Sequence, residues 1–184
     1  MSSSAYSKTS SPDPFSLFAR ALHWLMAAGI IAMLFIGVGM VASVSERHQW
    51  LIQIHKPLGI ALLVLVCVRL VRRLAGGVPA LPLDLPSWQR LAASGSHILL
   101  YALMFAMPLI GWAMVSAGGY PVTVGSWQLP AIAPTNAALF AWLRGAHRYC
   151  AFLLFATVLL HLAAALFHGW IRRDGVLASM VRGR

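Results

Sequence analysis

Long apolar runs dominate the chain and predict four membrane-spanning helices. A helix needs roughly 20 mostly apolar residues to cross the hydrocarbon core of a bilayer. Runs of this length cover Ala21–Val44, Leu51–Leu70, Leu91–Ala117 and Tyr149–Ile171. Three of them contain no Asp, Glu, Lys or Arg, and the second has Lys56 and Arg69 near its ends. Because helices satisfy their own backbone hydrogen bonds in lipid, the pattern predicts an all-α fold, an integral membrane four-helix bundle.

The segments at the two ends of the chain set the boundaries of this domain. Residues 1–15 are rich in Ser and Pro, and we expect a disordered N-terminal tail there. The transmembrane domain then covers residues 16–173, and residues 174–184 form a cytoplasmic C-terminal tail. The apolar run that begins near Ala21 is too long for a cleaved secretory signal, so we expect a retained helix.

Composition and charge agree with a membrane protein. Hydrophobic residues make up 60% of the chain and charged residues 10%, whereas a soluble domain has roughly 25% charged residues. The net charge of +10 would suit a nucleic-acid partner, but the cations are unevenly placed. Ten lie in the two tails or in the second loop: Lys8, Arg20, Arg69, Arg72, Arg73, Arg90, Arg172, Arg173, Arg182 and Arg184. The four on the other side are Arg47, Lys56, Arg144 and Arg148. Since cytoplasmic loops are enriched in Lys and Arg, both termini are predicted to be cytoplasmic, and the positive charge needs no nucleic acid to explain it.

This topology gives each histidine a depth in the membrane. His23 and His97 lie near the inner surface, and His55 and His147 lie near the outer surface. His161 follows His147 by fourteen residues, about 21 Å along a helix, which returns it to the inner side. The remaining histidines lie in the first outer loop and at the inner end of the fourth helix: His48 and His168. Fourteen residues fall only about 40° short of four full turns, so His147 and His161 share one helix face.

Histidines matched in depth suggest an iron held between helices. The fourth helix offers one imidazole at each depth, and the candidate partners are His55 for His147, and His23, His97 or His168 for His161. Imidazole is a good axial ligand for iron, and cofactors in bundles are commonly held by side chains on facing helices. Small residues that would admit a flat macrocycle lie nearby: Gly29, Gly59, Gly95, Gly145 and Gly169. We therefore predict two non-covalent b haems held between the helices.

Three other interpretations of these histidines remain open. A membrane histidine can simply hydrogen-bond to a neighbouring helix. Zinc is a second alternative, although no HExxH, CxxC or carboxylate cluster accompanies the histidines. A haemless transporter is the third, although the apolar cores contain no Asp or Glu for a proton relay. Covalent haem attachment is excluded because neither Cys67 nor Cys150 lies in a CxxCH motif, and we expect both to be packing residues.

The chain resembles the bacterial cytochrome b561 family in four segments: FARALHWLM, IHKPLGIALLVLVCVRLVRR, SHILLYALMFAMPLIGWAMVSAGGYPV and AHRYCAFLLFATVLLHLAAALFH. The resemblance extends from about Phe15 to Ile171, and this family is related to the cytochrome b subunits of hydrogenases and formate dehydrogenases. It implies haem ligands from the first helix, from the second and twice from the fourth: His23, His55, His147 and His161. The implied pairs are His23 with His161 and His55 with His147.

The resemblance also bears on the outer surface, because one superoxide-oxidising, quinone-reducing enzyme is known in this family. Three outer cations lie next to the outer ligands in the sequence: Lys56, Arg144 and Arg148. They are candidates for contacts with haem propionates or with an anion such as superoxide, since clustered charge speeds the arrival of an oppositely charged substrate. Many relatives have an acidic residue where this chain has Arg148, so the outer surface departs from the family pattern.

At the inner end, aromatic, cationic and imidazole side chains form a candidate quinone site: Arg20, Trp24, His97, His168 and Trp170. The alternative is an ordinary aromatic belt with positive-inside anchoring. The long outer loop, SAGGYPVTVGSWQLPAIAPTN, is a candidate docking surface or lid, although we expect a plain interfacial loop.

The sequence therefore predicts an electron carrier of the respiratory chain in the bacterial inner membrane. Its cofactors are two b haems, and it passes electrons between ubiquinone or another quinone and a periplasmic redox protein or superoxide. The alternative is a cytochrome b subunit that transfers electrons for a separate enzyme on the periplasmic face. With both axial positions filled by histidine, electron transfer is favoured over oxygen or peroxide chemistry.

Overall fold

The computed structural model describes residues 15–42, 44–76 and 86–183 of the chain. Four long helices make up most of it: α1 (Leu17–Val41), α2 (Glu46–Gly76), α3 (Ser87–Ala117) and α4 (Ala137–Leu166). Each is long and apolar enough to cross a membrane, and α4 continues directly into a π-helical segment, η1 (Phe167–Arg172). The four predicted spans are confirmed as helices, whereas residues 1–14 of the predicted N-terminal tail lie outside the described residues.

All four helices begin before the apolar runs that predicted them. α2 begins at Glu46 and α4 at Ala137, ahead of the expected starts at Leu51 and Tyr149. The added turns carry charged side chains, and long charged side chains can reach water from the end of a membrane helix. A charge that ends an apolar run therefore does not end the helix. α1 begins at Leu17, ahead of the expected Ala21, and ends at Val41, before the expected Val44.

Side-chain caps mark the starts of α1 and α4. The Ser16 hydroxyl accepts a hydrogen bond from the Ala19 amide at 3.3 Å, and the Asn136 side chain accepts one from the Leu139 amide at 2.9 Å. These bonds satisfy amides that have no partner within the first turn of a helix.

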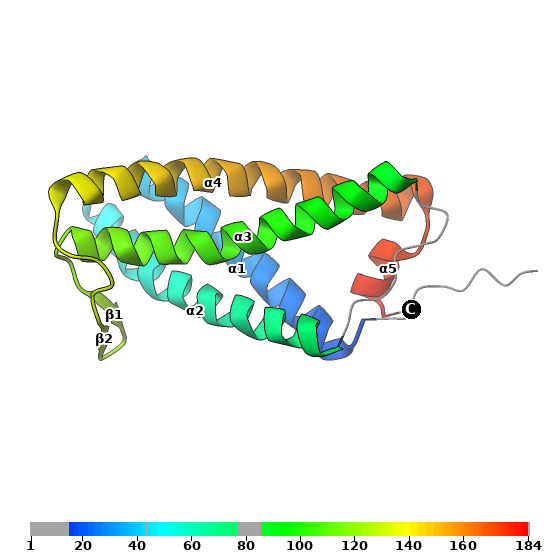
Figure 1. The fold of residues 1–184 in the computed structure, drawn as a ribbon, viewed down its shortest axis with the longest axis horizontal. Helices are drawn as coiled ribbons and strands as arrows, with labels where there is room; N and C mark the ends of the chain where they lie inside the picture. Colours follow the sequence, from blue (N-terminus) through cyan, green and yellow to red (C-terminus); the bar gives the residue numbers. More distant parts are fainter. Residues whose placement is uncertain (1–14, 43, 77–85, 184) are drawn as a thin grey trace, which may run out of the picture.

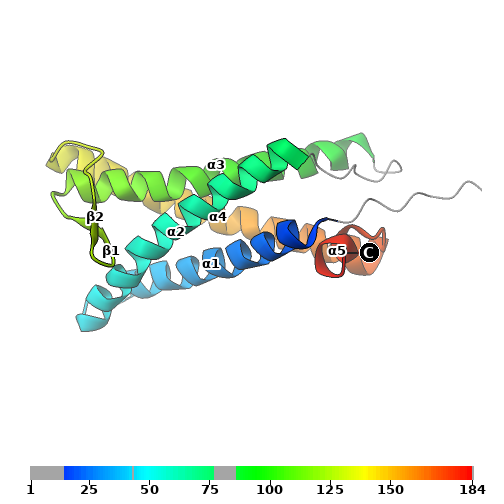
Figure 2. The same cartoon turned by 90° about the horizontal axis from the view of Figure 1, so that it is seen from below.

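Helices that follow one another in the sequence pack as two antiparallel pairs (Figures 1 and 2). α1 packs against α2, α3 packs against α4, and α2 also contacts α3. Four crossings bring the start of α1 and the end of α4 to the same end of the bundle, and the loop between α3 and α4 lies at the opposite end (Figure 1).

A small core joins the first three helices. Leu22 and Met26 of α1 meet Val66 of α2, and they contact partly buried side chains of α2 and α3: Leu63, Leu65, Tyr101, Met104 and Phe105. Large apolar side chains cover the exterior, where Phe35 is 75% and Leu160 is 70% exposed. An apolar exterior suits a bundle whose solvent is lipid.

The loop between α3 and α4 contains a short β-hairpin in place of the plain loop expected from the sequence. Strands β1 (Val122–Val124) and β2 (Trp127–Leu129) are antiparallel, with Val122 opposite Leu129. Gly125 opens the two-residue turn with a φ of 61°, a conformation that glycine adopts readily at the first position of a tight hairpin turn. The fold is therefore predominantly helical, with one small sheet.

The C-terminal segment turns back onto the bundle. Arg173 (φ 54°) and Gly175 (φ 81°) adopt left-handed conformations between η1 and the short helix α5 (Val176–Val181). The reversal places α5 against η1 and beside the start of α1 (Figure 2). The part of the predicted tail that the structure describes, residues 174–183, is thus a packed segment.

Candidate functional site

An imidazole pair lies toward the end of the bundle that carries the hairpin. His55 of α2 and His147 of α4 have ring centroids 6.2 Å apart, with ring planes at 68° to each other. Nδ1 of His55 is buried and has no hydrogen-bonding partner among the described residues. Gly111 of α3 lies beside the second ring: a Cβ atom added there would lie 3.2 Å from Cε1 of His147. Three helices thus frame this outer pair.

Three imidazoles gather toward the other end of the bundle. The ring of His161 of α4 has its centroid 6.3 Å from that of His23 of α1 and 5.6 Å from that of His97 of α3. One helix face of α4 therefore presents His147 and His161 to two separate groups of histidines, as their spacing predicts. The structure places the rings of both His23 and His97 beside that of His161. Either could therefore be the second ligand beside His161.

Within each of two imidazole pairs, the distance between the ring centroids fits a metal ion held between the two rings. A metal about 2 Å from one nitrogen of each of two opposed rings separates the ring centroids by about 6 Å. The pairs His55–His147 and His23–His161 have this separation. Within residues 15–42, 44–76 and 86–183, no three His, Cys, Asp or Glu side chains converge as a metal site. A haem would need two imidazoles from the protein at each level, and the outer level offers His55 and His147. The inner level offers His161 with either His23 or His97.

The predicted small residues serve different purposes. Gly29 allows α1 to approach α2, because a Cβ there would lie 2.9 Å from Leu62 of α2. Gly169 makes room for Leu177 of α5. Gly59 lies near Met33 of α1, whereas a Cβ on either of two others would meet nothing within 4 Å among the described residues: Gly95 and Gly145.

The three predicted outer cations are not equivalent. The Lys56 amine donates a hydrogen bond to the Pro121 carbonyl at 3.1 Å and so ties α2 to the start of the hairpin. Arg148 is exposed, and its guanidinium lies 5.2 Å from the centre of the Tyr149 ring. Arg144 is also exposed. Two of the three therefore face solvent near the outer pair, and the third holds the loop.

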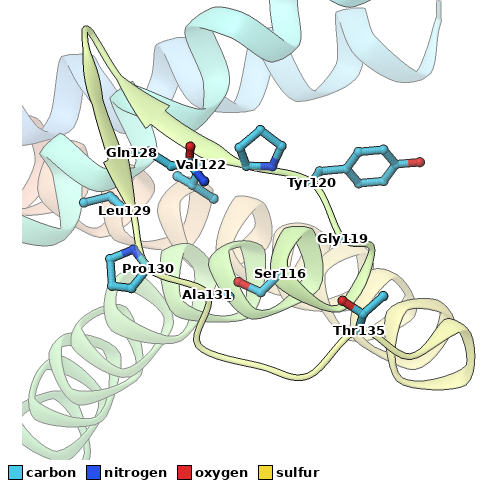
Figure 3. Close-up of a pocket in the computed structure, with 10 residues that line it drawn as sticks. Ser116, Gly119, Tyr120, Val122, Gln128, Leu129, Pro130, Ala131 and Thr135 are labelled. Atoms are coloured by element: carbon cyan, nitrogen blue, oxygen red, sulfur yellow. The ribbon is translucent and has the colours of Figure 1, made fainter.

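A shallow cavity of about 320 Å³ lies between the hairpin and the end of α3 (Figure 3). Its lining includes Ser116, Tyr120, Gln128 and Thr135, and no lining residue is charged. The Ser116 hydroxyl is already engaged, since it donates to the Trp112 carbonyl and accepts from the Ile132 amide. The Ser116 hydroxyl is therefore not free to bind a ligand in this cavity.

At the inner end, Arg20 and Trp24 of α1 bind the C-terminal segment. Nε of Arg20 and Nε1 of Trp24 both donate to the Met180 carbonyl, at 3.2 and 3.3 Å, and the Arg20 guanidinium also donates to the Val181 carbonyl. These carbonyls lie at the end of α5, where backbone acceptors have no partner within the helix.

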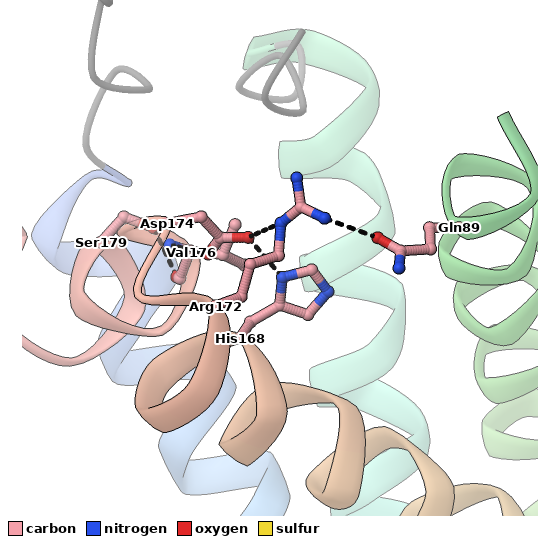
Figure 4. Close-up of polar contacts among 6 residues, drawn as sticks. All are labelled: Gln89, His168, Arg172, Asp174, Val176 and Ser179. Carbon is pink, nitrogen blue, oxygen red and sulfur yellow. Dashed lines mark hydrogen bonds and ion pairs between the residues drawn. The ribbon is translucent and has the colours of Figure 1, made fainter. Parts of the chain in front are cut away.

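His168 lies elsewhere at this end and faces Asp174 (Figure 4). Its Nδ1 is 2.5 Å from Oδ2 of Asp174, and Arg172 contacts the same oxygen through Nε at 3.1 Å. Four members of the predicted quinone set are therefore distributed over three places: Arg20 with Trp24 at α5, His97 at His161, and His168 at Asp174. The fifth, Trp170, is 69% exposed.

Three features of the site were absent from the sequence predictions. Gly111 and Asp174 were not singled out, and the hairpin was expected as a loop. The hairpin and the C-terminal reversal do have local signals, the Gly-Ser pair at Gly125 and the Asp-Gly pair at Asp174, which are typical of turns. Gly111 has none, because its contact with His147 comes from a different helix. Cys67, expected to be a packing residue, is exposed on α2, and Cys150 is half-buried.

Comparison with known proteins gives consistent matches over nearly the whole chain. A family model described as prokaryotic cytochrome b561 matches residues 14–183. "Cytochrome b561 homolog 2" of Escherichia coli (strain K12) is 30% identical over 180 residues, which cover 94% of each chain. "Probable superoxide oxidase CybB" of Yersinia pestis is 27% identical over 169 residues, 91% of this chain and 95% of that protein. "Cytochrome b562" of Cereibacter sphaeroides is 28% identical over 172 residues, 89% of this chain and 92% of that protein.

Proposed function

Because the chain belongs to the prokaryotic cytochrome b561 family, we propose that it is a di-haem cytochrome that carries electrons between a periplasmic donor and the membrane quinone pool. It is an integral membrane protein of a cytochrome family, and the family implies b-type haem. The number of haems, the ligands and the partners are our proposal. The observation that carries it is the two opposed imidazole pairs at two depths of one bundle.

The ligands that we propose are His55 with His147 for the outer haem and His23 with His161 for the inner haem. The centroid separations of 6.2 and 6.3 Å support these pairs. His97 also lies close to His161, at 5.6 Å, and the choice of His23 follows the resemblance to the family. Haem held by two histidines supplies one-electron transfer without a vacant iron position for oxygen. All four histidines are partly buried in the structure, and the helix framework fixes the separation within each pair.

The topology that we propose places the hairpin end in the periplasm and both termini in the cytoplasm of the bacterial inner membrane. The excess of Lys and Arg near the termini and in the second loop supports it. Of the five groups predicted for a quinone, Arg20 and Trp24 donate to carbonyls of α5, so the donors that we propose for a quinone at the inner end are His97, His168 and Trp170. Imidazole and indole N–H groups donate hydrogen bonds to carbonyl oxygens, which a quinone head group offers.

For the outer donor we propose superoxide, with a partner enzyme as the second candidate. The relative from Yersinia pestis carries the name of a superoxide oxidase, and Arg144 and Arg148 are exposed beside the outer pair. Exposed cations attract a small anion and raise its rate of arrival. The exposed side chains of Tyr120 and Trp127 on the uncharged outer loop favour the second candidate, since aromatic residues are enriched at protein interfaces.

Haem content tests the di-haem proposal. Purified protein is expected to hold two extractable b haems per chain with low-spin spectra. His55→Ala or His147→Ala should remove the outer haem, and His23→Ala or His161→Ala the inner one, while His97→Ala, the matched control, retains both. The pyridine haemochrome assay measures the ratio. Loss of the inner haem in His97→Ala with retention in His23→Ala would assign the ligand to α3 instead.

The salt dependence of haem reduction distinguishes superoxide from a partner enzyme as the outer electron donor. If the exposed cations steer superoxide, stopped-flow reduction of the haems by superoxide should be fast at low salt and slow as ionic strength rises, since the screening length is about 10 Å at 0.1 M. Arg144→Gln and Arg148→Gln should lower the rate about tenfold at low salt and leave haem content intact. A slow rate that does not respond to salt would favour the partner enzyme.

A further inference from the structure

The inner end of the bundle contains a histidine–carboxylate pair that the proposed haem ligands do not use. Nδ1 of His168 lies 2.5 Å from Oδ2 of Asp174, and the two side chains are 18% and 7% exposed (Figure 4). An ionised carboxylate only accepts hydrogen bonds, so Nδ1 is the donor. Nε2 of the same ring has no hydrogen-bonding partner among the described residues and is left for another molecule.

The carboxylate is itself held from three sides. Oδ1 of Asp174 accepts from the Val176 amide at 3.2 Å, and Oδ2 is 3.1 Å from Nε of Arg172. Arg172 also donates to the Gln89 side chain of α3 at 3.1 Å. Among the described residues, the charged group that contacts this His168–Asp174 pair is Arg172, which is bound in turn by the uncharged amide of Gln89 on α3. The arrangement fixes the orientation of the imidazole relative to α3 and η1.

The pair lies close to the proposed inner haem. His168 follows His161 by seven residues on one continuous helical segment, about 10 Å at the α-helical rise. Two turns of α-helix return a side chain to nearly the same face. His168 lies in the π-helical segment η1, and such segments are frequent at functional sites.

We propose that Asp174 is a positioning residue that makes His168 the proton donor for the quinone, an inference that rests on the proposed function. A quinone becomes a quinol by accepting two electrons and two protons, with one O–H bond formed at each carbonyl oxygen. The outer donor supplies the electrons. His168 gives one of these protons from Nε2 to the carbonyl oxygen that it faces and regains it from cytoplasmic water, and the other carbonyl oxygen takes its proton from water. Asp174 retains the Nδ1 hydrogen bond and keeps Nε2 directed at the quinone. Carboxylates orient catalytic imidazoles in the same way elsewhere.

Two oxidants that differ in their need for protons test this role. Protein with reduced haems is mixed with a short-chain ubiquinone or with ferricyanide, which takes one electron and no proton. In Asp174→Asn, oxidation by the quinone should be at least about tenfold slower, since a positioned proton donor contributes that much or more. The rate with ferricyanide should not change, the solvent deuterium isotope effect on the quinone reaction should increase, and the quinone dissociation constant should stay within about twofold.

Two further variants make the result interpretable. Asp174→Glu keeps the carboxylate and should recover part of the quinone rate, which guards against a variant that merely fails to fold. Glu46→Gln makes the same acid-to-amide change at the start of α2 and should leave both rates unchanged. A weaker dissociation constant with an unchanged limiting rate would reduce the pair to a structural contact and overturn the proposal, as would equal slowing with both oxidants. If the unaltered protein reacts with ferricyanide but never with the quinone, the proposed function itself fails.

Discussion

At the residue scale, the geometry of the outer imidazole pair depends on a glycine, which has no side chain to react or bind. Gly111 of α3 lies against His147, and a Cβ atom there would approach Cε1 to 3.2 Å. Any larger side chain must displace the ring or move α3. The residue therefore determines whether His147 can keep its orientation toward His55.

Replacing Gly111 by Leu tests this contact. Overpacking of this kind costs about 1–3 kcal/mol, and here the strain falls on a proposed haem ligand. We expect the haem content of Gly111→Leu to decrease toward one per chain, with the inner haem retained. Gly37→Leu on α1 is the matched control, because a Cβ there meets nothing within 4 Å among the described residues. Equal haem loss in both variants would show a general effect on the helices.

Spacing in the sequence predicts the depth of a residue in the membrane more reliably than it predicts which residues that residue contacts. It placed His55 with His147 and His161 with inner histidines, and the structure brings these rings together. It did not choose between His23 and His97, because rotation about a helix axis is fixed by packing between helices. Asp174 was not predicted for a related reason: it meets His168 across a turn in which Arg173 is left-handed, and the hydrophobic pattern of the sequence does not specify that turn.

At the scale of elements, the number and type of the long helices were predictable, and their ends were less so. Charged residues such as Arg47 and Arg144 closed the apolar runs, yet both lie inside helices. The short elements α5, β1 and β2 have six or fewer residues each. Segments this short carry too few apolar positions for periodicity, so only their turn residues signal them.

At each end of the bundle, one of these short elements is hydrogen-bonded to a long helix. The hairpin receives a hydrogen bond from Lys56 of α2, and α5 receives two kinds of donor from α1, the Arg20 guanidinium and the Trp24 indole. Each connection joins elements far apart in the sequence. In a membrane, where apolar contact between helices gives little net attraction, such polar contacts at the ends help hold the helices in position.

At the scale of the whole molecule, the arrangement follows from four crossings and the distribution of charge. The start of α1 and the end of α4 lie at one end of the bundle, and the hairpin lies at the other (Figure 1). Hydrophobic length predicts the crossings, and the Lys and Arg count predicts the side. Which helices pack against which is set by side-chain contacts such as those of Val66, which the sequence pattern alone does not specify.

Reporter fusions test the proposed orientation. A reporter that requires the cytoplasm should be active after Arg184, and one that requires the periplasm should be active when inserted in the turn at Ser126. Ten of the fourteen Lys and Arg residues lie on the side assigned to the cytoplasm, which is the physical basis of this expectation. The opposite pattern of activity would exchange the inner and outer labels and leave the histidine pairs unchanged.

The separation of the two histidine levels has an electrical consequence. His161 follows His147 on α4 by fourteen residues, about 21 Å of helix in a hydrocarbon core about 30 Å thick. In the proposed topology, an electron moving inward between these levels crosses roughly 0.7 of the membrane thickness. With a negative cell interior, every 100 mV of membrane potential then opposes that movement by about 1.6 kcal/mol. In the proposed function, the span of one helix would couple electron transfer to the membrane potential: a high potential would slow inward electron flow, and a collapsed potential would speed it.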